Sequence, residues 1–566
     1  MKPTLHLVFL AGLIFSRSLV ASTDSTGLTK KRWIGLSSGI TVSAQYYRNW
    51  GADPRQQPFM YSISGAPALD IGGVSMPFSV IYSNQAFSFQ QPFNQFGLAP
   101  RFKWGTVFLG TSSVRFSSYT LAGQRFMGAG ADLQLGKFRL GGMYGRLRRA
   151  VFPLGNLNDP QTFLNEAEAP AFKRNGYTFK LGFGTKENFF DFIWFKAWDV
   201  KPDNYSVADW PVKPTENVVF GVNSQIKLGK KVTLKNDWAI SALTRDINAD
   251  TLEIENSTAR NFARRVLLPR TTTSIRIAGE SSIRYNHKFA SPSLSYKRIE
   301  HDFTSLGAYF FLTDIQQLTG GLQLSLFKKK LSTNFSYGRQ RDNLQGLRLR
   351  TSTRNIGAAS VQFNPSPKWG MSLNYSNFGI SQSPLPKALT DTSRINQVNN
   401  SLTFIPRLNI QRKNSMHSVN LVLGYAALTN LGASIGASAA TTSYNANLSY
   451  NWQLQPLFLS AGVTPSVINT ETILGTFRAT GASFNAGKGF MKGKWMLNYA
   501  LSVFGNTFNG AENGRTLTHL ISLSGNIPRW PSLALNIQHI NNTSNNLQAA
   551  PSFRELYANL TISYNF

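Results

Sequence analysis

Single lysine and arginine residues placed beside apolar residues are the side chains of this chain with the clearest chemical consequence. Eight of them follow this pattern: Lys103, Arg139, Lys180, Lys235, Arg276, Arg284, Lys297 and Arg478. In an extended strand, successive side chains point to opposite faces, so each cation would lie on the face opposite to its apolar neighbours. A face that repeats cations in this way can attract anions. Fewer acids share the pattern, at Asp132, Asp191, Asp237 and Glu300, and a ladder of salt bridges is the alternative interpretation.

Patterns for covalent catalysis or metal binding are weak. Residues 432–436 match G-x-S-x-G around Ser434, but they lie in a stretch rich in Gly, Ala and Ser and not at a strand-to-helix turn. His417 and Ser418 are adjacent, which is best explained as chance. The six histidines are scattered and the chain has no cysteine, so no metal-ligand spacing or disulfide is present. We therefore expect no enzyme activity and no catalytic, metal or cofactor site.

The segments that carry the cations alternate apolar and polar residues, as half-exposed strands do. In 495–503 the odd positions are Trp, Leu, Tyr, Leu and Val, and the segments 369–376, 444–452 and 533–538 repeat the alternation. Aromatic residues often stand at the ends of these apolar rows. Transmembrane barrels place aromatic girdles at the two membrane interfaces.

The C-terminal segment is the most regular of these strands. In 556–566, Leu556, Ala558, Leu560, Ile562, Tyr564 and Phe566 share one face, and polar residues fill most of the other. The segment is about as long as a tilted strand that crosses a bilayer. It resembles the assembly signal, with its terminal aromatic residue, of Gram-negative outer-membrane β-barrel proteins of the porin-like kind. The resemblance implies that Tyr564 and Phe566 belong to a signal read by the barrel-assembly machinery.

Composition agrees with a barrel that has one lipid face and one wet face. Charged residues make up only 15% of the chain, and no segment after the N-terminal region approaches eighteen consecutive apolar residues. The chain has 58 Lys and Arg against 27 Asp and Glu, spread along its length. Contact with anionic outer-membrane lipid and lipopolysaccharide explains this excess, and a basic lumen is the second explanation. We expect no nucleic-acid partner, because the basic strand positions are interleaved with apolar ones.

Short and long connections alternate along the chain, which is typical of a barrel with short periplasmic turns and longer external loops. The short ones are expected near 135–137, 184–188, 228–231, 290–292, 328–330, 364–368, 453–456, 487–493 and 527–531. The long ones are expected at 149–176, 201–217, 243–271, 341–353, 380–396, 430–440, 465–474, 506–515 and 541–552. The prediction is an all-β fold with one large antiparallel transmembrane β-barrel of about 22–26 strands, best 24, over residues 23–566. Residues 54–100 are expected to add strands, with a lumen or constriction segment as the alternative.

The N-terminal residues 1–22 read as a signal peptide with a basic start, an apolar stretch at 5–15 and small residues near Ala21. The expected location is the cell outer membrane. We expect a channel or porin-like protein that passes solutes, with a basic lumen that favours anions. The alternatives are an occluded barrel with a structural, assembly or secretion role and an envelope partner protein, and a barrel-embedded hydrolase.

Overall fold

The computed structural model describes residues 34–37, 39–71, 74–84, 95–151, 170–202, 212–252, 266–308, 313–346, 353–381, 396–430, 440–526, 530–545 and 552–565. The predicted signal peptide (1–22), Ser434 and Phe566 lie outside these residues. Within them, no helix has the length and apolar character needed to cross a membrane.

The described residues form one antiparallel sheet of 29 strand segments. The segments are β1 (Ile34–Ser37), β2 (Gly39–Trp50), β3 (Phe59–Gly65), β4 (Ala68–Ile71), β5 (Val74–Ser83), β6 (Gln95–Leu98), β7 (Arg101–Phe102), β8 (Gly105–Arg115), β9 (Ala122–Leu135), β10 (Phe138–Arg148), β11 (Lys173–Gly184), β12 (Phe189–Val200), β13 (Glu216–Leu228), β14 (Val232–Thr244), β15 (Thr273–Tyr285), β16 (Ala290–Ile299), β17 (Ile315–Leu326), β18 (Leu331–Asp342), β19 (Thr353–Phe363), β20 (Trp369–Ser381), β21 (Asn396–Gln411), β22 (Ser415–Asn430), β23 (Ala440–Leu454), β24 (Leu459–Thr472), β25 (Gly475–Phe490), β26 (Trp495–Phe508), β27 (Ala511–Gly525), β28 (Ser532–Thr543) and β29 (Phe553–Asn565).

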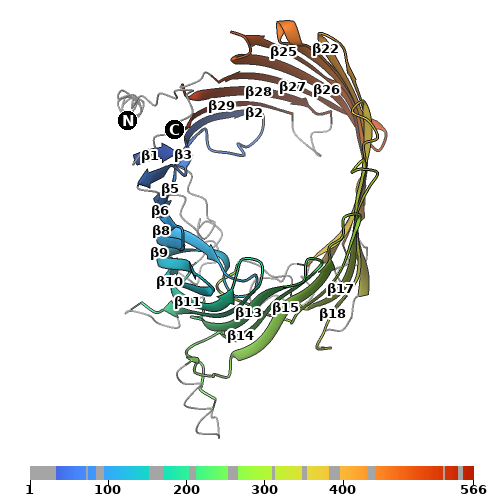
Figure 1. The fold of residues 1–566 in the computed structure, drawn as a ribbon. Helices are drawn as coiled ribbons and strands as arrows, with labels where there is room; N and C mark the ends of the chain where they lie inside the picture. Colours follow the sequence, from blue (N-terminus) through green and yellow to red (C-terminus); the bar gives the residue numbers. More distant parts are fainter. Residues whose placement is uncertain are drawn as a thin grey trace, which may run out of the picture.

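The sheet closes into a barrel, seen nearly end-on in Figure 1, where β29 lies beside β2. The closing pair runs from Gly39 opposite Asn565 to Trp50 opposite Arg554. Three strands of the wall are each divided into two segments: β1 with β2, β3 with β4, and β6 with β7. Counted as single strands, these pairs reduce the 29 segments to 26 wall strands. Pro67 and Pro100 lie in two of these interruptions, where the missing N–H breaks a ladder. The all-β barrel is confirmed, and its 26 strands exceed the best single value of 24.

The two faces of the wall differ in chemistry. In β11, Phe179, Leu181 and Phe183 share one face and are about half exposed, whereas Thr178 and Lys180 share the other. Exposed apolar rows of this kind recur in almost every wall strand. Such rows belong against the hydrocarbon of a bilayer, so they mark the outer face, and the polar rows mark the inner face.

The two rims differ in the length of their connections. One rim has turns of two to six residues, such as 136–137 between β9 and β10, and the other has most of the longer connections. Three predicted connections are wrong. Residues 290–292 belong to β16. Residues 465–472 belong to β24, which ends in a two-residue turn at 473–474, and residues 511–515 belong to β27, which begins after a two-residue turn at 509–510. The predicted connection began at Pro465, but the β23–β24 ladder skips this residue and β24 continues past it.

Residues 54–100, predicted as strands or as a lumen segment, lie in the wall where the structure describes them, as β3 to β6. Tyr564 of the predicted assembly signal lies in β29 opposite Ile40 of the first wall strand. The final strand therefore forms one side of the closing seam.

Candidate constriction on the inner wall

The tip of the β8–β9 hairpin leaves the wall. Beyond Met127, β9 no longer pairs with β10, although its pairing with β8 continues as far as Arg115 opposite Ala122. On its other side, β8 pairs with β6 only at Leu109 and Gly110. Residues 111–126 are here called the inward hairpin. Apart from Thr111, which lies opposite Met127, they pair only with one another among the described strands.

The inward hairpin is held by β13 and β14, which lie four and five strands along the wall from β9. The Asp237 carboxylate accepts hydrogen bonds from Ser117 Oγ at 2.5 Å and from the Ser118 backbone N–H at 2.8 Å. Asn223 Nδ2 donates to the Phe116 carbonyl at 3.0 Å. Strands are spaced about 4.8 Å apart, so the path around the wall from β9 to β14 is roughly 24 Å. A hairpin this short reaches β14 by crossing the concave inner side.

A second segment, residues 300–308 after β16, lies against the same part of the inner face and is here called the inner loop. Ser305 Oγ donates to the Thr120 carbonyl at 2.5 Å, and the Ala122 N–H donates to the Gly307 carbonyl at 3.0 Å. Asn217 Oδ1 accepts from the Leu306 N–H at 3.0 Å. The inner loop thus ties the inward hairpin to β13.

Apolar side chains fill the space between these segments and the wall. Phe116, Tyr119 and Leu121 of the inward hairpin and Phe303 of the inner loop are almost fully buried. They pack in one cluster with inner-face residues of β10, β12, β13, β14 and β15, including Phe195, whose side chain has no exposed surface. An apolar patch on the wet face of a barrel wall would be unfavourable if it were uncovered. The two segments cover it, which fixes them as structured parts of the lumen.

Burial raises the pKa of Tyr119 above its ordinary range, and the nearby negative charges of Glu280 and Asp237 raise it further. The hydroxyl therefore stays protonated at every physiological pH. A neutral Tyr119 is what the docked hairpin requires, because a phenolate at this site would be both desolvated and repelled.

Two of the predicted cations are neutralised by predicted acids on the inner face. Arg139 forms a two-pronged ion pair with Asp191 at 2.6 and 2.8 Å. Lys180 contacts Asp132 at 2.5 Å and lies over the ring of Phe116, 4.6 Å from its centroid. These pairs brace the wall beside the inward hairpin, and they fit the salt-bridge interpretation.

Other predicted cations lie on the inner face without an acidic partner among the described residues. Lys235 and Arg284 are exposed on β14 and β15. Both lie closer to the rim of short turns than Asp237 does. Lys297 lies opposite Glu280 in the register, with no ion pair between them. Arg276 is used differently, because its side chain donates to the carbonyls of His301 and Ile275.

The remaining two predicted lumen residues are placed elsewhere. Lys103 lies in the turn between β7 and β8 and is not in a strand. In β25, Arg478 shares its face with Phe484, which is half exposed and pairs with Leu501 in an outward row. The register therefore puts Arg478 on the outer face near the rim of long connections. Its neighbours Phe477 and Ala479 point inward there, which the apolar pattern alone could not reveal.

Two polar clusters were not predicted from the sequence. A β-bulge at the end of β10 turns Arg148 inward, where it and Arg174 both contact the buried carboxylate of Asp199. At the closing seam, the buried Glu555 accepts hydrogen bonds from Tyr47 Oη at 3.0 Å and Asn49 Nδ2 at 3.1 Å. Tyr47 and Glu555 are 508 positions apart, so their contact follows from the strand register and not from their spacing in the sequence.

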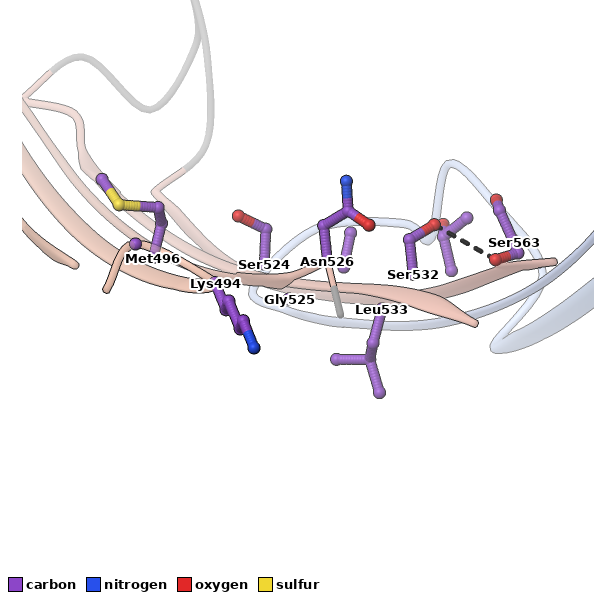
Figure 2. A pocket seen from close by; sticks show the side chains of 11 residues that line it. Lys494, Met496, Ser524, Gly525, Asn526, Ser532, Leu533 and Ser563 are labelled. Carbon is purple, nitrogen blue, oxygen red and sulfur yellow. Dashed lines mark hydrogen bonds between the residues drawn. The ribbon is translucent and has the colours of Figure 1, made fainter. Parts of the chain in front are cut away.

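The opposite wall, from β19 to β29, is largely uncharged on its inner face. Hydroxyl pairs cross adjacent strands there, for example Ser376 with Ser401 and Ser483 with Ser502, each at 2.7 Å. Figure 2 shows a pocket at the short-turn rim of β26–β29, where Ser532 donates to the Ser563 carbonyl. The inner face therefore carries most of its charges on the side of the inward hairpin, and few, such as Glu555 and Arg407, across from it.

The His417–Ser418 pair is split between the two faces of β22. His417 Nδ1 contacts Tyr450 Oη at 2.9 Å on the outer face, while Ser418 Oγ accepts from Asn420 Nδ2 at 3.1 Å on the inner face. These two residues do not form a catalytic dyad. Within the described residues, no three His, Asp or Glu side chains are grouped to hold a metal ion.

No protein-family model matches this chain, and no curated protein matches it either. Solved structures of outer-membrane β-barrel proteins match it with low scores. The P pilus usher PapC translocation pore has a TM-score of 0.36 at 10% identity, covering 94% of this chain and 100% of that chain. The FrpB iron transporter of Neisseria meningitidis has a TM-score of 0.35 at 11% identity, covering 93% and 82%. Acinetobacter baumannii OccAB2 has a TM-score of 0.30 at 8% identity, covering 62% and 92%. Similarity at this level carries no argument about what this chain does.

Proposed function

We propose that this chain is an outer-membrane channel for hydrophilic solutes, narrowed on one side by the inward hairpin. The observation that carries the proposal is a closed ring of 26 wall strands with a lipid-facing outer row and a polar inner row. Barrels of 16–18 strands already enclose an aqueous channel, and wider ones need something in the lumen to restrict passage. The inward hairpin and the inner loop supply such a restriction.

Anion preference is the finer part of the proposal. Arg139 and Lys180 are paired with Asp191 and Asp132, so they contribute little net field. Lys235 and Arg284 have no acidic partner among the described residues and lie on the short-turn side of the inward hairpin. Cations on the wall of a confined passage raise the local concentration of anions.

Conductance and reversal potential in planar bilayers under a salt gradient test both parts. The K235E/R284E variant should shift the reversal potential toward cation selectivity, because it changes the charge of the passage by four units. R478E, which changes the charge by two units, is the outer-face control, since Arg478 lies on the outer face and its reversal should leave selectivity unchanged. Equal shifts in the two variants would refute the assignment of Lys235 and Arg284 to the conducting path.

Absence of conductance in the wild-type protein and in a variant lacking residues 116–121 would refute the channel. It would support the alternative of an occluded barrel with a structural or secretion role in the envelope.

A further inference from the structure

The charges of the connections are divided unequally between the two rims. In the described part of the short-turn rim, eleven connections carry fourteen cations and one acid, Glu187. The cations are Lys103, Lys137, Lys186, Lys230, Lys231, Lys288, Lys328, Lys329, Lys330, Lys368, Arg412, Lys413, Lys492 and Lys494. In the described connections of the other rim, six cations are matched by six acids. Counted this way, the short-turn rim has a formal charge of +13 and the other rim zero.

These cations surround the barrel. Nine of the eleven short connections contain at least one, and all fourteen side chains are exposed. The run Lys328 to Lys330 forms most of the turn between β17 and β18, with Lys328 and Lys329 in the left-handed backbone region. No acidic partner reaches any of the fourteen among the described residues. Like charges held around a ring without partners require an external counter-charge.

Large apolar side chains accompany the cations at this rim. Phe327 and Met491, next to Lys328 and Lys492, are each about 70% exposed, and Trp104 and Phe289 adjoin Lys103 and Lys288. Aromatic girdles mark the level of lipid headgroups in transmembrane barrels. A cation directly beyond such a girdle stands at the level of lipid phosphates.

Figure 2 shows the direction of one of these lysines. Lys494 points to the same side of the sheet as Leu533, whereas Ser524, Asn526 and Ser532 point to the opposite side. Leu533 belongs to the outer apolar row of β28, opposite Ile562. The Lys494 amine is therefore directed toward surrounding lipid and away from the lumen.

We propose that the lysines of the short-turn rim form a binding ring for anionic phospholipid headgroups in the adjoining leaflet. The ligand chemistry is a phosphodiester with a net negative charge, as in phosphatidylglycerol. A compact acidic protein would contact one arc of the rim, whereas a leaflet reaches all nine cationic turns at once. The proposal depends on the barrel and its outer face, and it does not depend on whether the lumen conducts.

Native mass spectrometry of the detergent-solubilised protein, titrated with phosphatidylglycerol or phosphatidylcholine, tests the ring. The wild type should retain phosphatidylglycerol in preference to phosphatidylcholine. Each lysine near an anionic surface should contribute roughly fivefold to retention. The K328Q/K329Q/K330Q variant should therefore bind at least fivefold less phosphatidylglycerol, and K328R/K329R/K330R should bind as the wild type does.

The matched control is K201Q/K213Q/R245Q, which removes the same charge from the opposite rim and should leave phosphatidylglycerol retention unchanged. Equal retention of the two lipids by the wild type, or equal losses in the two Gln variants, would overturn the proposal. Stronger lysine-dependent retention of lipid A than of phosphatidylglycerol would overturn it too, because the source of the phosphate would then be the other leaflet. Conductance of K328Q/K329Q/K330Q should match the wild type, which separates this test from that of the channel.

Discussion

Releasing the inward hairpin from the wall should widen the channel. The contacts of the hairpin with Asp237 and its buried side chains determine which substitutions can release it. Asp237 accepts two hydrogen bonds from the hairpin, each worth roughly 1.5–3 kcal/mol because the acceptor is charged. We use about 1.5 kcal/mol for each bond, because both hydrogen bonds to Asp237 are only partly buried. The D237A substitution should thus cost about 3 kcal/mol of docking free energy, which raises the ratio of released to docked hairpin by about 10²-fold.

Burial of the hairpin's own side chains sets the remaining energy. Phe116, Tyr119 and Leu121 are nearly fully buried, and each contributes roughly 1.5–3 kcal/mol. Their sum exceeds the loss of the two hydrogen bonds, so D237A alone should leave the hairpin docked for most of the time. Brief steps to higher conductance are expected in single-channel recordings. The D237A/Y119A variant removes a large side chain as well and should hold the higher conductance for longer.

The matched control is E471A, which removes an exposed carboxylate from β24 and should leave the recordings unchanged. Heat-dependent migration on gels verifies that each variant keeps a folded barrel. If folded D237A/Y119A conducts as the wild type does, with the same noise, then the inward hairpin does not narrow the path and the reasoning is refuted.

Three further outcomes are expected. The pKa of Tyr119 is raised above its ordinary value of 10.0 in the docked hairpin. The docked state is therefore favoured over the released state below pH 10.0, and it loses stability as the pH rises above 10.0. Conductance noise should therefore grow above about pH 10 in the wild type and less in Y119F. R139A should lower the unfolding temperature more than D191N, because it leaves the buried Asp191 charge unpaired at a cost of about 3–5 kcal/mol. E555A should lower the resistance of the barrel to heat on gels, since Tyr47 loses its partner across the closing seam, and wild-type resistance in E555A would contradict that role.

The sequence predicts the wall well because one physical rule governs it. A strand that crosses a bilayer must present apolar residues to lipid at every second position, and this rule identified the faces of Lys180 and Lys235. The rule fails where a strand extends beyond the lipid. There the outer row becomes polar, as at Arg478, and alternation no longer tells the two faces apart.

The inward hairpin could not be predicted from the sequence. Val114, Phe116 and Leu121 resemble the apolar residues of a wall strand, and their partners in β13 and β14 lie about 100 residues away. The cationic rim escaped prediction for a similar reason. Its lysines are spread along the chain, and only the alternation of strand direction gathers them at one end.

Closure of the barrel by β2 and β29 has a consequence for how the chain folds. The hydrogen bond between the hydroxyls of Thr41 and Ser563 joins residues separated by 522 positions. Contacts of such separation form late and slowly, because the intervening chain must first be ordered. Until then two long strands have unpaired backbone edges, which are sites for aggregation. During folding, the free backbone edges of this chain therefore need to be covered until β29 pairs with β2.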